Sequence, residues 1–209
     1  MMLAKQIQPF LKNLKGAIHV GANIGEERFW YKTCGFTKVL WFEPNKDIFP
    51  ILKKNIKDFP NQVAFNIGIH DHLRKAMLHI ANNRGQSSSL LDLGLHAQYH
   101  PDVKCIGDQE IKLTRLDYFL EDFDYVVADY NFLNVDVQGT ELNVLLSMGD
   151  LLSNLDYIYL EVNTQEVYKD CALLSEIDDY LSMFSFIRIK TKMTKAYWGD
   201  AFYIKERSL

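Results

Sequence analysis

Short apolar runs alternate with segments of helical spacing along most of the chain, and this alternation constrains the fold more than any other feature. Apolar runs at 17–20, 39–42 and 63–69 have the length and composition of buried strands. The segments 26–34 and 46–58, which separate these runs, have the spacing of helices. Because strands joined by single helices run parallel, the sequence predicts an α/β fold with a doubly wound parallel sheet.

The same alternation resumes in the second half of the chain. The predicted elements there are strands at 132–137 and 155–162, helices at 140–148 and 173–183, and a closing hairpin of strands at 184–190 and 201–205. A short amphipathic helix is also expected at 3–14. Since no linker divides the 209 residues, we expect a single domain, 1–209.

A long irregular stretch, 82–108, lies between the two halves and is flanked by candidate strands at 74–80 and 109–114. Loops of this length are usually functional or disordered. We therefore expect a substrate loop or lid, and an exposed insertion without a role is the alternative. The side chains of this stretch that favour a functional loop are Arg84, His96, Tyr99 and His100.

Composition narrows the function classes. The formal net charge is −4, so the chain lacks the basic surface that holds nucleic acid, and we expect no nucleic-acid partner. Three widely spaced cysteines offer neither a disulfide framework nor zinc-ligand spacing. No apolar run approaches the roughly 20 residues of a membrane span, and lysines interrupt the first 16 residues. We expect a cytoplasmic protein, and the sequence does not indicate its oligomeric state.

The glycine-rich turn Gly21-Ala22-Asn23-Ile24-Gly25 follows the first predicted strand. Glycines there let the backbone turn tightly and approach a ligand, and the next helix start adds free N–H groups. The nicotinamide fingerprint G-x-G-x-x-G and the P-loop are both absent. The turn therefore indicates a different nucleotide-like ligand, and a tight turn that binds nothing is the alternative.

The next two strand ends fit the rest of such a ligand. Glu43, followed by Pro44, ends the second predicted strand, where a carboxylate can accept hydrogen bonds from ribose hydroxyls. Asp71 follows the third strand and could accept from an exocyclic amine, while Ile67 or Ile69 could flank the ring. Ordinary strand-end polarity is the alternative for each residue taken alone.

Two further carboxylates end the fourth and fifth strands. Asp136 and Glu161 stand at the ends of neighbouring parallel strands and are expected to converge. Two such groups can bind a hard cation or act as a base with a shifted pKa. Glu141 is expected to begin the following helix and to complement its dipole. Strand-end polarity without chemistry is again the alternative.

Taken in order, these segments resemble the FkbM family of S-adenosylmethionine-dependent methyltransferases over about residues 16–205. The pieces that carry the resemblance are HVGANIGEE at 19–27, WFEPN at 41–45, NFLNVDVQGTELNVL at 131–145, EVN at 161–163 and WGDAFYIK at 198–205. The resemblance implies the Rossmann-like class I methyltransferase sheet, with seven strands, the last antiparallel, and helices on both faces.

The resemblance also implies positions for the cofactor. The methionine part would lie against the first turn, the ribose on the second strand end and the adenine at the third. The residues implied are His19, Gly21, Ala22, Asn23 and Gly25 for the methionine part, Glu43 and Pro44 for the ribose, Ile67, Gly68, Ile69 and Asp71 for the adenine, with Asp136 at the border toward the acceptor.

The expected activity is O-methylation of a sugar or other small-molecule or glycan hydroxyl. Asp136 is the candidate base, with Glu161 beside it and His96 reaching in from the long loop. Some family members use magnesium at such carboxylates, so Asp136 and Glu161 are also the candidate Mg²⁺ ligands. The chain departs from the common family pattern at four positions, His19, Asn134, Gln138 and Gly139.

Other functions stay open. A cofactor-binding module of the same fold without catalysis is the main alternative, and an oxidoreductase or nucleotide-sugar domain is a second. The absence of G-x-G-x-x-G counts against nicotinamide chemistry. A nucleic-acid amino-methyltransferase would carry an Asn/Asp-Pro-Pro-aromatic motif, which the chain lacks.

Overall fold

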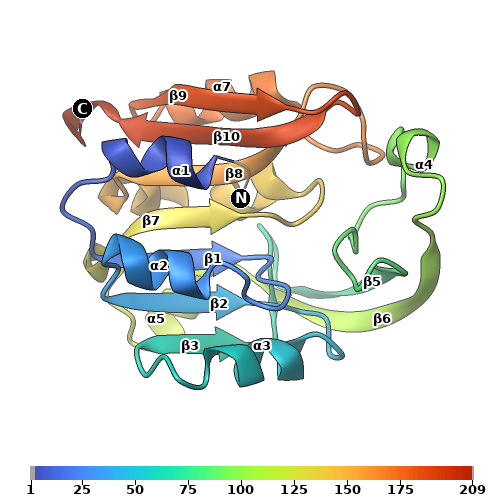
Figure 1. The fold of residues 1–209 in the computed structure, drawn as a ribbon, viewed down its shortest axis with the longest axis horizontal. Helices are drawn as coiled ribbons and strands as arrows, with labels where there is room; N and C mark the ends of the chain where they lie inside the picture. The colour runs from blue at the N-terminus through green and yellow to red at the C-terminus, as the bar shows by residue number, and fades with distance from the viewer. Residues whose placement is uncertain (1–2, 209) are drawn as a thin grey trace.

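A seven-stranded sheet organises the computed structural model, which describes residues 3–208. Its spatial order is β3-β2-β1-β7-β8-β10-β9, and only β10 runs antiparallel to its neighbours (Figure 1). The strands are β1 Gly16–Val20, β2 Lys38–Phe42, β3 Gln62–Phe65, β7 Tyr130–Val135, β8 Tyr157–Asn163, β9 Phe186–Met193 and β10 Trp198–Lys205. The predicted doubly wound sheet with an antiparallel last strand is confirmed.

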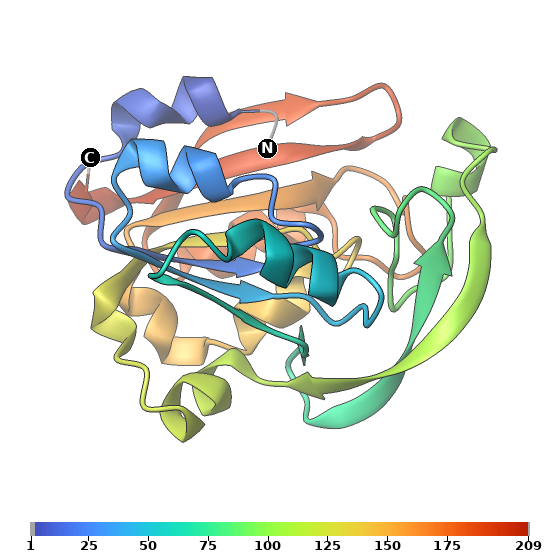
Figure 2. The same ribbon diagram turned by 60° about the horizontal axis from the view of Figure 1, so that its bottom comes forward.

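Helices cover both faces of this sheet, as expected for strands buried on both sides (Figure 2). One face carries α1 Ala4–Ile7, α2 Arg28–Cys34 and α3 Phe49–Ile56, and the other carries α5 Leu116–Asp122, α6 Glu141–Leu146 and α7 Leu174–Ser182. Short 3₁₀ turns lie at Gln8–Phe10, Val127–Asp129, Gly149–Asn154 and Glu206–Ser208. In the described part of the chain no helix is long and apolar enough to cross a membrane.

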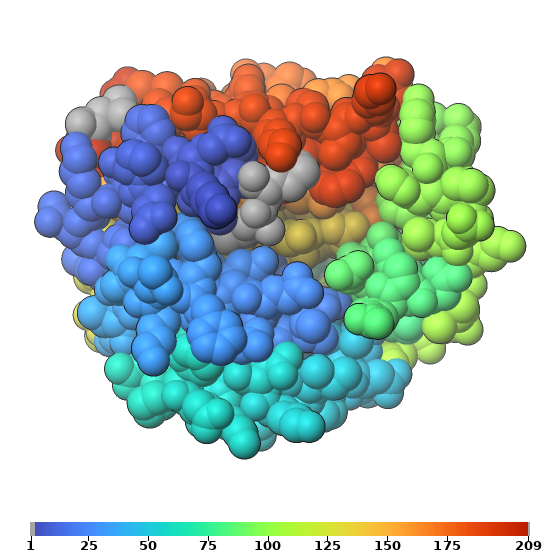
Figure 3. Space-filling view, in the orientation of Figure 1, coloured from blue at the N-terminus to red at the C-terminus, as the bar shows by residue number. Residues whose placement is uncertain are grey.

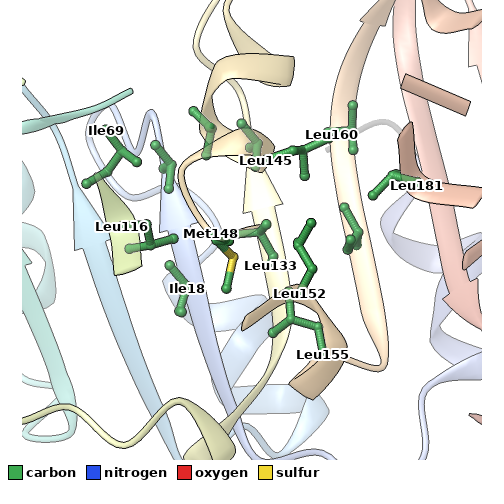
Figure 4. Close-up of a cluster of buried hydrophobic side chains, with 14 of the residues drawn as sticks. Ile18, Ile69, Leu116, Leu133, Leu145, Met148, Leu152, Leu155, Leu160 and Leu181 are labelled. Carbon is green, nitrogen blue, oxygen red and sulfur yellow. The ribbon is translucent and has the colours of Figure 1, made fainter. Parts of the chain in front are cut away.

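Alternate residues of each central strand enter different cores. Ile18 and Leu133 pack with α5, α6 and α7, whereas Ala17 and Phe132 pack with α1, α2 and α3. Figure 4 shows the first of these cores, where Leu145 of α6 meets the sheet. Every residue of β1, β7 and β8 is buried, which explains why these strands read as continuous apolar runs.

A second, three-stranded sheet is inserted between β3 and β7. Its order is β4-β6-β5, with β6 antiparallel to β5 and parallel to β4. The strands are β4 Gly68–Ile69, β5 Arg74–Ala81 and β6 Cys105–Thr114. Figures 1 and 2 both place it, with helix α4 His96–Tyr99, beyond the carboxyl ends of β1, β2 and β7. The candidate strands at 74–80 and 109–114 are therefore confirmed, as partners in a sheet of their own.

The single strand predicted at 63–69 is wrong, because the chain changes sheets in its middle. Asn66 Nδ2 donates to the carbonyl oxygens of Glu43 at 2.8 Å and Pro44 at 3.0 Å. These bonds hold the chain in a turn at the end of β3, so that Gly68 and Ile69 pair with β6 instead. The irregular stretch is also shorter than predicted, since residues 105–108 belong to β6.

Helix ends differ from the predicted ones for local reasons. Asn45 Oδ1 accepts from the backbone N–H groups of Asp47 and Ile48, and this turn delays α3 until Phe49. Pro50 then sits in the first helical turn, where no N–H is needed. The predicted helix at 3–14 ends at residue 10, and α5 was not predicted.

Substitution of Gly21 tests the close approach of the turn after β1 to the end of β7. Its φ is +80°, and an added Cβ would lie 1.7 Å from the carbonyl oxygen of Asp136. Gly35 has a similar φ, +94°, with no neighbour within 4 Å of such a Cβ. We expect Gly35→Ala to cost about 1–2 kcal/mol of unfolding free energy through backbone strain alone. Gly21→Ala should cost several times more, measured by urea denaturation. Equal losses would show that the approach of Gly21 to Asp136 does not matter.

Candidate active site

A cavity of about 400 Å³ opens at the carboxyl ends of β1, β2, β7 and β8. The inserted sheet and residues 83–103 form its opposite wall. In Figure 3 the surface is hollowed between the blue segment that follows β1 and the green inserted segment. The volume lies in the range of ligand pockets, and the place is where open α/β sheets bind their ligands.

Glu43 holds together the turns on one side of this cavity. Its Oε2 accepts from the Asn23 N–H at 2.7 Å, and its Oε1 accepts from the Asn45 N–H at 2.8 Å. Burial raises the pKa of Glu43 to about 7, against the opposing effect of these two hydrogen bonds. Each oxygen keeps a further lone pair for a hydroxyl donor, so the carboxylate can still hold a ribose.

His19 lies beside this turn and belongs to a neutral network. It faces Asn134 in the β1–β7 register, and the Tyr31 hydroxyl contacts both, at 3.1 Å from His19 Nδ1 and 3.0 Å from Asn134 Nδ2. The His19 ring stacks on Trp41 with centroids 4.8 Å apart. Burial lowers the pKa of His19 to about 4. Two departures from the family pattern, His19 and Asn134, thus form one uncharged unit at the cavity wall.

One wall of the cavity is apolar and joins the end of β2 to β4 and the inserted sheet. Phe42 and Ile69 line the cavity together with Leu78 and Leu113 of the inserted sheet. Pro44, Ile67 and Gly68 line it as well. An added Cβ at Gly68 would lie 2.5 Å from Leu113 Cδ2, so the glycine allows close approach of β4 to β6. Such a surface suits a flat aromatic ring.

Two of the predicted cofactor residues do not line the cavity. Gly25 faces α3 instead, where an added Cβ would lie 2.7 Å from Leu52 Cδ1. The Asp71 carboxylate is held by its own neighbours, with Oδ1 at 2.5 Å from His70 Nδ1 and 2.8 Å from His72 Nδ1. The Asp71 carboxylate is therefore engaged by these histidines outside the cavity lining, and its contact with an adenine stays a prediction.

Asp136 and Glu161 meet on the floor of the cavity, joined by Gln138. Gln138 Nε2 donates to Asp136 Oδ1 at 2.5 Å and to Glu161 Oε2 at 3.1 Å. Gln138 Oε1 accepts from the Tyr168 hydroxyl at 2.5 Å. Asp200 of β10 pairs with Glu161 across the strands and accepts from the Tyr159 hydroxyl. The sequence did not reveal that Gln138 bridges these carboxylates, although its place two residues after Asp136 was a signal.

The environment of these carboxylates opposes their ionisation. Enclosure away from bulk water raises the pKa of Asp136 to about 6. Burial, and next the negative charge of Asp136, raise the pKa of Glu161 well above its usual range. The Asp136 side chain is accessible from the cavity, whereas Glu161 is only 6% exposed. Asp136 is thus the carboxylate that can meet an incoming hydroxyl.

Glu141 shapes the turn that carries Gln138. It begins α6 as predicted, and its Oε1 accepts from the backbone N–H groups of Val137 and Gly139, each at 3.1 Å. Gln138 and Gly139 both have positive φ, at +59° and +113°. The buried Glu141 carboxylate therefore fixes the strained turn and the position of the Gln138 side chain.

The irregular segment brings one of its predicted side chains close to this floor. His96 lies 5.5 Å from Tyr168 between ring centroids, and its backbone N–H donates to the Val167 carbonyl at 3.0 Å. Within residues 3–208 its Nδ1 has no hydrogen-bond partner although it is buried. His100 also lines the cavity, whereas Tyr99 is exposed and lies outside it.

Comparison with known proteins identifies the family. Residues 19–188 match the family described as methyltransferase FkbM domain. The chain belongs to this family. Over 177 residues it is 23% identical to the 2-O-methyltransferase NoeI of Sinorhizobium fredii, covering 81% of this chain and 72% of that protein. It is 28% identical over 194 residues to the hexuronic acid methyltransferase AglP of Haloferax volcanii, covering 90% and 69%.

Solved structures agree on the fold of this FkbM-family protein. TrmK of M. capricolum in complex with S-adenosylhomocysteine superposes with a TM-score of 0.57 at 7% identity, covering 99% of this chain and 68% of that chain. The METTL16 methyltransferase domain gives 0.56 at 10% identity, covering 98% and 65%. At these identities the likeness concerns the fold alone.

The family membership makes this chain an S-adenosylmethionine-dependent methyltransferase, and the cavity fits that cofactor. Glu43 offers acceptors for the ribose hydroxyls, and the wall at Phe42 and Ile69 offers an apolar surface for the adenine. The turn Gly21-Ala22-Asn23 lines the cavity between Glu43 and Asp136, where the methionine part would extend. These contacts are predictions that the geometry allows.

The raised pKa of Glu43 has a consequence for stability. Between pH 4.5 and about 7 the unfolded chain releases this proton while the folded protein retains it. Unfolding free energy should therefore fall as the pH rises through this window, with an upper bound of about 3 kcal/mol from this group. Glu43→Gln should flatten that slope, measured by chemical denaturation from pH 5 to 8. The exposed Glu26→Gln is the control, and an unchanged slope in Glu43→Gln would contradict the assignment.

Proposed function

We propose that this chain transfers the methyl group of S-adenosylmethionine to a hydroxyl of a sugar, either free or within a glycan. The observation that carries the proposal is the pair Asp136 and Glu161, joined by Gln138 at the cavity floor. The names of the two relatives, a 2-O-methyltransferase and a hexuronic acid methyltransferase, support an oxygen acceptor and a sugar substrate.

Asp136 is the proposed base. When bound, S-adenosylmethionine would supply a methyl group activated by its sulfonium: an acceptor oxygen in line with the carbon–sulfur bond would form a carbon–oxygen bond to the methyl carbon as the carbon–sulfur bond breaks, and S-adenosylhomocysteine would leave. Asp136 takes the hydroxyl proton, and its pKa of about 6 leaves it ionised at neutral pH. Glu161 and Gln138 position it, because the Gln138 amide donates to both carboxylates. Placement of the oxygen can supply roughly 7–11 kcal/mol of the barrier.

The segment 82–108 is the proposed acceptor wall within a single domain, 1–209. Hydrogen bonds attach this segment to the side of the cavity that carries Asp136. Ser89 Oγ donates to the backbone carbonyl of Gln138 at 2.6 Å. The Gly94 and His96 N–H groups both donate to the Val167 carbonyl at 3.0 Å. The buried His96 Nδ1 then offers a partner for an acceptor hydroxyl.

Two other functions fit less well. A non-catalytic cofactor-binding module would have no use for carboxylates whose pKa values are raised beside an open cavity. A nucleic-acid acceptor is disfavoured by the net charge of −4. Among the fold neighbours is a structure titled as a putative RNA methyltransferase, but at 11% identity this likeness concerns the fold alone.

Two variants that separate catalysis from cofactor binding test the proposal. Asp136→Asn keeps the size of the side chain but removes the base, so turnover should fall at least 100-fold while S-adenosylmethionine binding stays within a few-fold. Glu43→Ala should instead weaken cofactor binding at least 10-fold. Calorimetric titration with S-adenosylmethionine and S-adenosylhomocysteine, with NAD as control, measures the binding. Undiminished turnover of Asp136→Asn would exclude it as the base.

Magnesium is a separate expectation. Asp136 and Glu161 would hold Mg²⁺ if the reaction uses one, and the ion would polarise the acceptor oxygen. In the structure the Gln138 amide bridges these carboxylates. Within residues 3–208 neither carboxylate belongs to a group of three ligand atoms within 4.8 Å of one another. A cation would therefore have to displace the Gln138 amide.

We expect turnover to survive in EDTA, because the Gln138 amide already supplies the positive end of a dipole between the carboxylates. The measurement is the release of S-adenosylhomocysteine with EDTA, and again after adding excess MgCl₂. Loss of turnover in EDTA that only Mg²⁺ restores would show that a cation takes the place of the amide. Gln138→Glu should then increase the response to Mg²⁺.

A further inference from the structure

The charges that line the cavity all have one sign. Six carboxylates line it, and within residues 3–208 no lysine or arginine does. They are Glu26, Glu27, Glu43, Asp136, Glu161 and Asp200. Glu43 lies at the cofactor end, so the pair that an acceptor must meet is Asp136 and Glu161. An acceptor therefore meets the ionised Asp136 without a guanidinium or ammonium among these lining residues.

Two cationic side chains that neighbour lining residues in the sequence, Arg28 and Lys169, have partners elsewhere. The Arg28 guanidinium donates to the Gly25 carbonyl at 2.8 Å and lies over the Phe29 ring. Lys169, which follows Tyr168, forms an ion pair with Asp92 at 3.1 Å. Neither residue lines the cavity. Their own contacts therefore keep these two cations away from the cavity.

Two imidazoles of the cavity, His19 and His96, do not replace the missing cations. Burial lowers the pKa of His19 to about 4, and it also lowers the pKa of His96. Both rings are therefore uncharged at neutral pH. His100 is the third lining imidazole, and its ring centroid lies 4.9 Å from that of His96.

The polar groups and the aromatic ring at the acceptor end of the cavity suit an uncharged polyol. Asp136 is an acceptor for hydroxyl donors, and His96 Nδ1 adds a buried polar atom that has no hydrogen-bond partner among residues 3–208. The half-buried Trp198 ring lines the same end and can cover the apolar face of a sugar ring. A carboxylate or phosphate in this place would face the Asp136 carboxylate and lose its hydration without gaining a lysine or arginine partner from the lining residues.

We propose that the sugar unit held in this cavity is uncharged, bearing neither a carboxylate nor a phosphate. This inference rests on the proposed function and makes it narrower: hexoses, deoxyhexoses and their uncharged glycosides are accepted, whereas uronic acids and sugar phosphates are rejected. The selection works by exclusion, since like charges and an unpaired desolvated anion count against the wrong acceptor.

Binding and turnover should be measured separately. The protein, saturated with S-adenosylhomocysteine, is applied to a glycan array in which neutral terminal sugars are matched with their uronic acid and phosphorylated counterparts. Bound sugars are then tested as acceptors by release of S-adenosylhomocysteine from S-adenosylmethionine. We expect neutral members to bind and to be methylated, with kcat/KM at least 10-fold above that of the matched uronic acid.

The outcomes distinguish the two proposals. Preference for the uronic acid or phosphate member of a pair would overturn the uncharged acceptor, even if methylation occurs. Neutral sugars that bind without being methylated would overturn the proposed function and leave the binding preference in place. Failure of every sugar to bind would contradict both, because the cavity would then not be a sugar site.

A matched pair of charge insertions sharpens the test. Gln86 is exposed at the cavity lining, and Gln98 is exposed on the same segment but outside the lining. Gln86→Arg should raise kcat/KM for the uronic acid relative to the neutral sugar at least 5-fold, whereas Gln98→Arg should leave that ratio unchanged. Equal ratios in both variants would show that local charge does not select the acceptor.

Discussion

The meeting of β1 and β7 at the centre of the sheet sets the geometry of everything around it. The Asp136 N–H donates to the Val20 carbonyl at 2.9 Å, and the Gly21 backbone lies against the Asp136 carbonyl. This contact brings the cofactor turn and the proposed base to one point, because both follow directly from paired strands. The chemistry is therefore placed by backbone pairing, and side chains add only the final orientation.

The site concentrates carboxyl groups whose pKa values are raised by burial. Each of them lowers the free energy of unfolding as the pH rises above the pKa that the group has in the unfolded chain. Different neighbours offset this cost for each group. Backbone N–H groups bind Glu43 and Glu141, and the Gln138 amide binds Asp136 and Glu161. The first pair holds turns in position, and the second faces the cavity floor. Hydrogen bonds to carboxylates thus fix the framework in one place and hold a candidate base in the other, where burial raises the pKa of Asp136 against the effect of the Gln138 bond.

The alternating pattern was enough to predict the main sheet, because buried parallel strands read as unbroken apolar runs. The pattern did not predict the features that long-range contacts determine, such as where a strand ends. Asn66 ends β3 by bonding to carbonyls more than 20 residues away, and no local pattern reveals this. Sequence order placed Asp136 and Glu161 near one another, but the bridging by Gln138 depends on a positive-φ turn. Gly25 and Asp71 belong to the expected motifs, yet Gly25 packs against α3 and the Asp71 carboxylate contacts the neighbouring histidines.

The inserted segment, residues 66–114, gives this member of a common fold its own character. The cofactor half of the cavity is built from β1 and β2, which the fold shares with many methyltransferases. The opposite wall comes from the inserted sheet and α4, and it supplies apolar side chains and the imidazoles of His96 and His100. Within residues 3–208 no lysine or arginine lines it. The proposed base and its partners lie at strand ends of the main sheet, so the two sides of the cavity would meet different parts of an acceptor.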